Sequence, residues 1–107
     1  MNTTVENAMH HMIAVIKESE IYQEYRLQLE KVKQQPELKA QIDEFRTRNY
    51  LLQVSRDNEL DKIYELEREY EDFRENPLVS DFLAAELAFC RMMQDINSRV
   101  TAAMDFE

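Results

Sequence analysis

The side chains of this sequence that could do chemistry are two adjacent histidines, one cysteine and many carboxylates. On a helix, His10 and His11 point roughly 100° apart, so they cannot hold one metal ion as an i, i+4 pair can. A di-iron helical bundle needs Glu-x-x-His on two helices. Glu6 is one residue too far from His10 to complete that motif, and this near match occurs once. We therefore expect no metal site.

Cys90 is the one cysteine of the sequence, so an internal disulfide and a multi-cysteine metal site are excluded. It lies among Phe89, Met92 and Met93, and we expect a buried, small hydrophobic residue. A nucleophile would need a positioned base beside it. The sequence has no glycine and hence no glycine-rich phosphate-binding loop. We predict no catalytic residue, no cofactor and no small-molecule substrate, and therefore a protein that is not an enzyme.

The composition predicts the fold class. The 107 residues fit one domain, residues 1–107, and 44% of them are hydrophobic. Glycine is absent and proline occurs twice, whereas β-hairpin turns usually need glycine at positive φ. The common residues are instead good helix formers. We predict an all-α protein.

The charge is unevenly distributed along the chain. Residues 1–56 carry eight acidic and eight basic residues, whereas residues 57–107 carry fourteen acidic and five basic ones, so the net charge of −9 comes from the second half. Nucleic acids and anionic membranes are bound by basic surfaces. We therefore expect no direct nucleic-acid binding and no membrane binding. The N-terminus lacks the features of a signal peptide, and we predict a cytoplasmic protein.

Periodicity and capping residues divide the chain into four or five helices. We expect short connections to make neighbouring helices pack as antiparallel hairpins. The first helix begins at Thr3, which forms a capping box with Glu6, and Ser19 caps the next helix. These two segments could also form one bent helix. The remaining predicted helices begin at Pro36, cover 60–73, and run from Pro77 to about Met104.

The last helix should span about 40 Å, which is longer than its neighbours can cover. Its apolar residues follow a spacing of four and three residues that is typical of a coiled-coil seam. We expect a homo-oligomer, either a dimer or a tetramer, or a hetero-oligomer with a related protein. The alternative is a helix at the centre of a monomeric bundle. The candidate self-interface residues are Phe82, Phe89, Met92, Met93, Ile96 and Val100. The methionines, among them Met9 and Met12, are otherwise expected to fill the core.

Two charged features remain. Glu86 borders the apolar arc of the last helix and could pair with Arg46 or Arg48, which would fix the register between helices. The predicted helix over 60–73 has an acidic face, which we interpret as a surface for a basic partner. Its residues are Glu65, Glu67, Glu69 and Asp72. The simpler interpretation is a solvated face that keeps the protein soluble.

The segment from Asn76 to Leu87, followed by Met92 and Ile96, resembles the C-terminal signature of the YlbF/YmcA family of bacterial regulators. The order of the preceding helices is also similar to that family. The resemblance implies a small cytoplasmic helical protein that forms homo- or hetero-oligomers and influences competence, sporulation and biofilm formation. It implies an accessory role in RNA processing rather than enzymatic activity.

Some family members carry a cysteine-bearing tail linked to an iron–sulfur cluster. This sequence ends at Phe106-Glu107 and offers only Cys90, so we do not carry cluster binding over. The sequence thus favours a regulatory adaptor that acts through helix–helix contacts. Two alternatives remain open, namely a ligand- or metal-binding helical bundle and a structural or chaperone-like oligomer.

Overall fold

The computed structural model describes residues 2–54 and 60–105, and every regular element in this part of the chain is an α-helix. The all-α prediction is confirmed, as is the long C-terminal helix. The helices are α1 (Thr3–Glu18), α2 (Glu20–Lys33), α3 (Pro36–Val54), α4 (Leu60–Glu69), α5 (Glu71–Glu75) and α6 (Pro77–Ala103). The segment 55–58, whose polar composition predicts a loop, lies outside the described residues.

Capping residues set most of the helix boundaries. The Ser19 hydroxyl accepts a hydrogen bond from the backbone N–H of Tyr22 at 3.2 Å, so α1 and α2 are two helices. The Asn76 side chain accepts from the N–H of Leu78 at 3.0 Å, and Pro77 occupies the first turn of α6.

Helix α1 begins at Thr3, as expected, but its capping residue differs from the prediction. Asn2, rather than Thr3, is the N-cap of α1, and its side chain accepts from the Thr4 N–H at 2.7 Å. Asn is a better N-cap than Thr, which explains why Asn2 and not Thr3 caps the helix.

The structure has six helices because the segment predicted as one helix over 60–73 is interrupted at Tyr70. This residue leaves helical geometry, with φ −104° and ψ 12°. Its buried ring packs edge-on against Phe45 at 5.1 Å and Phe73 at 5.4 Å. Backbone hydrogen bonds from Tyr70 to Leu66 and from Arg74 to Tyr70 continue through the break. Aromatic packing against α3 thus accompanies a bend that helix propensity does not predict.

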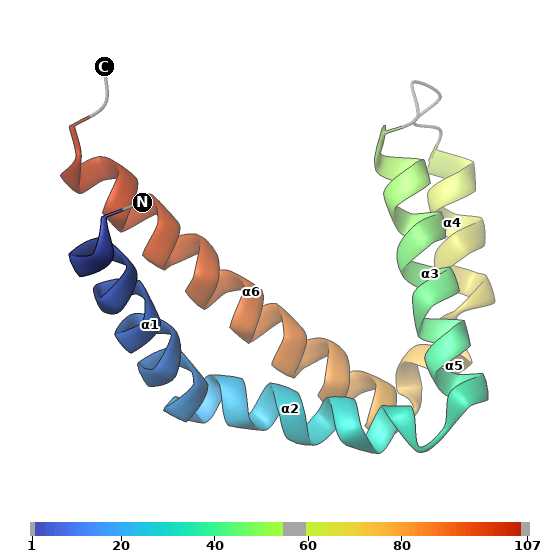
Figure 1. Cartoon of the computed structure of the whole chain (residues 1–107). Helices are drawn as coiled ribbons and strands as arrows, with labels where there is room; N and C mark the ends of the chain where they lie inside the picture. The colour runs from blue at the N-terminus through green and yellow to red at the C-terminus, as the bar shows by residue number, and fades with distance from the viewer. Residues whose placement is uncertain (1, 55–59, 106–107) are drawn as a thin grey trace.

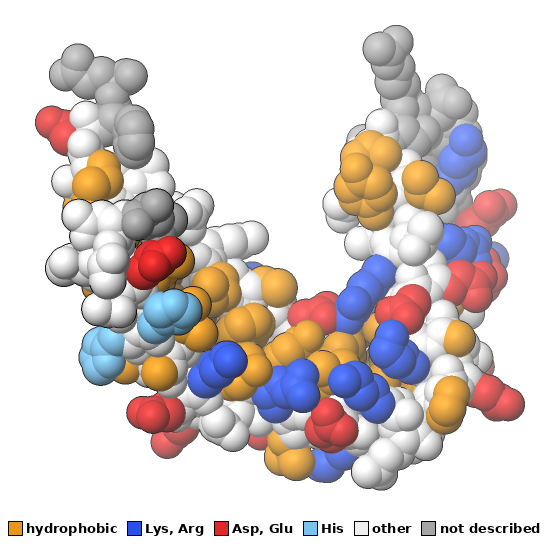
Figure 2. All heavy atoms as spheres, viewed as in Figure 1, with side chains coloured by type: hydrophobic (Ala, Val, Ile, Leu, Met, Phe, Trp, Pro, Cys, Tyr) orange, Lys and Arg blue, Asp and Glu red, His pale blue; other side chains and the backbone are white. Residues whose placement is uncertain are grey.

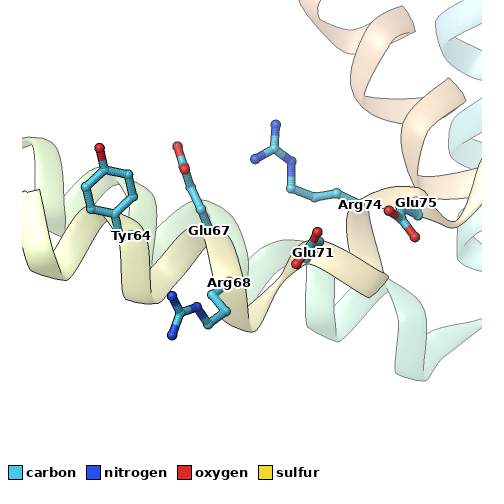
Figure 3. Close-up of a pocket in the computed structure, with 6 residues that line it drawn as sticks. All are labelled: Tyr64, Glu67, Arg68, Glu71, Arg74 and Glu75. Carbon is cyan, nitrogen blue, oxygen red and sulfur yellow. The ribbon is translucent and has the colours of Figure 1, made fainter.

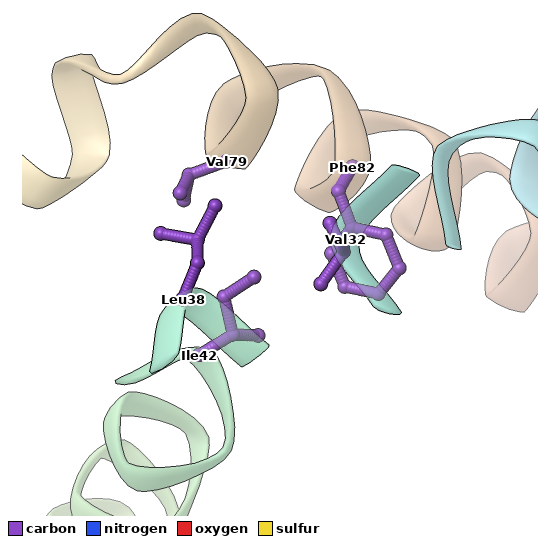
Figure 4. Close-up of a cluster of buried hydrophobic side chains, with 5 residues drawn as sticks. All are labelled: Val32, Leu38, Ile42, Val79 and Phe82. Atoms are coloured by element: carbon purple, nitrogen blue, oxygen red, sulfur yellow. The ribbon is translucent and has the colours of Figure 1, made fainter. Parts of the chain in front are cut away.

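The best-buried side chains gather where α2, α3 and α6 meet (Figure 4). We call this cluster the hinge core, and its members are at most 8% exposed. The hinge core consists of Val32, Leu38, Ile42, Val79 and Phe82. Because these residues come from three helices, the hinge core fixes how α3 leaves α2 and α6.

Two arms extend from the hinge core (Figure 1). One contains α1, α2 and α6, with α2 packed along α6, and we call it the long arm. The other contains the antiparallel pair α3 and α4, and we call it the hairpin arm. The radius of gyration is 17.9 Å, whereas a compact domain of this length has about 13 Å. The arms are therefore open to the surroundings on several sides.

Candidate interaction site

The structure divides the six predicted self-interface residues into an internal and an outer group. Phe82 is 2% exposed and belongs to the hinge core, so this side chain is used within the chain. Phe89 is half-buried and stacks on Tyr25, with ring centroids 5.1 Å apart and an interplanar angle of 13°. Its ring also lies 5.4 Å from that of Tyr22. Both phenylalanines thus hold α6 against α2.

The outer group lies on the part of α6 beyond Phe89. Met92 and Ile96 are half-buried, whereas Met93 is 39% and Val100 49% exposed. Cys90, which we expected to be buried, is exposed. The expected burial is wrong because neighbouring residues of a helix point about 100° apart, and it is Phe89, not Cys90, whose side chain packs on α2.

Helix α1 carries a second apolar stripe, which was not among the predicted interface residues. Among its described residues α1 buries none. Met9 and Met12, which we expected in the core, are exposed instead. The spacing of apolar residues in the sequence indicates this stripe, but it does not show whether another helix covers it. Its members, with their exposed fractions, are Val5 (52%), Met9 (38%), Met12 (39%) and Ile13 (41%).

Helix α1 and the distal half of α6 extend toward the same end of the long arm (Figure 1). Figure 2 shows hydrophobic side chains gathered along the course of α6 on the side facing the viewer. We call six of the exposed apolar residues of these two helices the open apolar face. It consists of Val5, Met9, Met12 and Ile13 of α1 with Met93 and Val100 of α6. Large exposed apolar surfaces of this kind mark sites of protein interaction.

Glu86 pairs with Arg46, one of the two partners considered from the sequence. The Arg46 guanidinium also lies 5.4 Å from the centre of the Phe82 ring. The side chain of Glu86 is 24% exposed and that of Arg46 is 41% exposed, so water screens the pair in part. The contact joins α3 of the hairpin arm to α6 of the long arm. A role of Glu86 in fixing helix register remains a prediction.

The predicted acidic face lies on α4 and α5. Glu65, Glu67 and Asp72 are exposed, but Glu69 accepts a hydrogen bond from the Arg48 guanidinium at 2.6 Å. Arg48 also donates to the Tyr70 hydroxyl at 3.3 Å. Glu69 thus ties α4 to α3.

An open groove of about 500 Å³ runs along α4 and α5 (Figure 3). Its labelled side chains point in different directions instead of converging on one point. The lining residues are Tyr64, Glu67, Arg68, Glu71, Arg74 and Glu75. A groove of mixed charge with scattered side chains suits a broad charged contact better than a reaction centre.

Protonation should weaken the contact between Arg48 and Glu69. The hydrogen bond from Arg48 lowers the pKa of Glu69 below its ordinary value of 4.5. A carboxylate with a lowered pKa in the folded state stabilises the fold above its unfolded-state pKa, and this contribution is lost as the pH falls through the folded-state pKa. We expect Glu69→Gln to lower the melting temperature slightly at pH 7, and we expect this effect to disappear as the pH falls through the lowered pKa of Glu69. Thermal melts from pH 7 to pH 2.5 measure this, with Glu67→Gln as control. An equal effect at all pH values would contradict the prediction.

No described helix combines the length and apolar character that crossing a membrane requires. Likewise, within residues 2–54 and 60–105, His, Cys, Asp and Glu side chains do not come together in threes that could hold a metal ion.

Comparison with known proteins agrees with this helical layout. Residues 5–105 match the family model described as control of competence regulator ComK, YlbF/YmcA. The chain is also 22% identical to a UPF0342 protein of Caldicellulosiruptor bescii over 107 residues, which cover 96% of this chain and 90% of that protein. No solved structure matches the chain. Since the family model covers nearly the whole sequence, the chain belongs to the YlbF/YmcA family.

Proposed function

We propose that this chain is a non-enzymatic regulatory adaptor that works in an oligomer through helix–helix contacts. Membership of the YlbF/YmcA family, which is described by control of the competence regulator ComK, supports a role related to the control of competence. The observation that carries the mechanism is the open apolar face, whose side chains are 38–52% exposed. Such a face is costly to leave in water and gains free energy when another helix covers it.

The acidic face supports the second half of the proposal, which is contact with a basic partner. Glu65, Glu67 and Asp72 are exposed on the hairpin arm and on α5. Charged surfaces of one sign steer an oppositely charged partner and set the orientation of binding. The adaptor would thus use its apolar surface for assembly and its acidic surface to bind the basic partner.

The oligomer is tested by light scattering of the full chain between about 1 and 100 μM, the usual range for moderate association. The chain has a mass of 12.9 kDa. We expect a mass of at least twice this value at the upper concentrations, because the open apolar face is then covered. A mass of 12.9 kDa throughout would contradict the proposal. The matched control is Glu65→Lys with Asp72→Lys, which should leave the assembly unchanged.

A further inference from the structure

We propose that a pocket between α2 and α3 binds an acidic peptide segment of a partner protein. One apolar side chain of this segment enters the pocket, and the carboxylates beside it contact the Lys and Arg side chains around the mouth. The inference goes beyond the proposed function, because neither the open apolar face nor the acidic face of α4 and α5 takes part.

The pocket lies where α2 and α3 meet over Phe82 of α6, and we call it the elbow pocket. Its volume is about 190 Å³, whereas pockets for drug-sized ligands have about 300–1,000 Å³. The apolar part of its lining consists of Leu29, Val32, Ile42 and Phe82. The last three belong to the hinge core and are at most 2% exposed. The elbow pocket therefore suits a single apolar side chain, the kind of anchor that dominates many protein interfaces.

The charged part of the lining comes from α3. Lys39 and Arg46 line the elbow pocket together with Asp43. The Lys39 Nζ lies 2.9 Å from Asp43 Oδ2, and a guanidinium nitrogen of Arg46 lies 4.0 Å from Asp43 Oδ1. Arg46 also pairs with Glu86 and lies 5.4 Å from the centre of the Phe82 ring, so several contacts hold its guanidinium near the pocket. The side chains of Lys39 and Arg46 are 42% and 41% exposed, so a ligand at the mouth can contact both.

Helix α2 adds further cations beside the elbow pocket. Arg26 and Lys33 are three and four residues from Leu29, so they lie on the same side of α2. Both lie near Glu30, at 3.3 Å and 3.9 Å. Figure 2 shows Lys and Arg side chains gathered around hydrophobic ones where the two arms meet.

The charge of this region is opposite to that of the rest of the chain. Residues 26–48 carry six basic and four acidic residues, a net charge of +2. The other residues carry seven basic and eighteen acidic ones, a net charge of −11. Most of the surface therefore repels an acidic partner, whereas the region around the elbow pocket attracts it. Charge complementarity thus identifies an acidic segment as the occupant.

The chemistry of the pocket favours a peptide over a phosphate or a nucleic acid. The apolar lining offers a phosphate group no hydrogen-bond donors, whereas it contacts a hydrocarbon side chain on several sides. The pairs of Arg26 with Glu30 and of Lys39 with Asp43 join exposed side chains four residues apart on one helix. Such pairs contribute little to stability, so both cations can exchange their partners for carboxylates of a ligand. A large apolar side chain flanked by Asp and Glu matches both parts of the elbow pocket.

Fluorescence polarisation with labelled peptides and the full chain tests the site. The probes are nine-residue peptides with a central Leu or Phe flanked by Asp and Glu, and we expect a Kd on the order of 10–100 μM. Replacing the central residue by Ser should weaken binding about tenfold or more, because the buried apolar surface is lost. Peptides with Lys and Arg in the flanks should not bind.

Two charge variants should change the affinity for the acidic peptides in opposite directions. Arg46→Gln removes the guanidinium at the mouth and should raise the Kd about tenfold. Asp43→Asn removes the carboxylate that competes for Lys39 and Arg46, and it should lower the Kd about threefold. The matched controls are Arg99→Gln and Asp95→Asn, which make the same charge changes in a pair on α6 whose side chains are 81% and 59% exposed. Both controls should leave the Kd unchanged.

Far-UV circular dichroism of each variant shows that the helices are retained. If Arg46→Gln unfolds, Lys39→Gln still decides, because the pair of Lys39 with Asp43 lies within α3. Equal changes in Kd for the elbow variants and the α6 controls would show a general response to net charge and overturn the site. Absence of binding by every acidic peptide at about 1 mM overturns it as well, as does binding of a labelled single-stranded oligonucleotide in place of the peptides. These results leave the proposed function standing, since light scattering tests that function separately.

Discussion

Phe82→Ala should destabilise the fold more than any other single truncation on α6. Phe82 is 2% exposed at the point where α2, α3 and α6 meet. Its ring lies 6.2 Å from that of Tyr25 and under the Arg46 guanidinium. Truncating a buried Phe to Ala removes its transfer free energy and leaves a cavity, at a cost of about 3–5 kcal/mol. Small domains are stable by only about 5–15 kcal/mol, so a large part of the stability would be lost.

Urea unfolding followed by circular dichroism measures this loss. The control is Leu87→Ala on the same helix, since Leu87 is 50% exposed. Exposed substitutions change the free energy of unfolding by about 0.5 kcal/mol or less. Both variants should be compared with wild type at one protein concentration, because association also contributes to stability. Equal losses for the two variants would show that Phe82 is not part of the core.

Local rules in the sequence predicted the helix boundaries. Three helices begin where expected, at Ser19, Pro36 and Asn76-Pro77. These boundaries could be predicted because capping and proline geometry depend on neighbouring residues alone. The bend at Tyr70 was missed because its cause is the packing of that ring against Phe45 of α3. Tertiary contacts of this kind override helix propensity.

The candidate interaction site was predicted in part. The spacing on α6 identifies an apolar face, but the spacing does not say which helix covers each portion of it. Phe82 and Phe89 meet Tyr25 of α2, whereas Met93 and Val100 are 39% and 49% exposed. The stripe on α1 has a clear period as well. Its exposure depends on the direction in which α1 leaves the Ser19 joint, and local sequence rules do not fix that direction.

Phe89→Ala should also destabilise the single chain, by about 2–3 kcal/mol. The ring is half-buried, so the loss is smaller than for a fully buried Phe. The contacts with Tyr25 and Tyr22 contribute about 0.5–1.5 kcal/mol per aromatic pair beyond the buried area. Phe89→Leu keeps much of the volume and removes the stacking, so we expect it to lose about half as much.

The concentration dependence separates the internal role of Phe89 from a role between chains. A side chain that joins α2 to α6 within one chain stabilises it equally at every protein concentration. A side chain that joins two copies stabilises more as the concentration rises. We therefore expect the loss on Phe89→Ala to remain when urea unfolding is repeated at a dilution at which sedimentation shows single chains. If the loss of stability vanishes on dilution, Phe89 belongs to the self-interface, as its spacing in the sequence predicts.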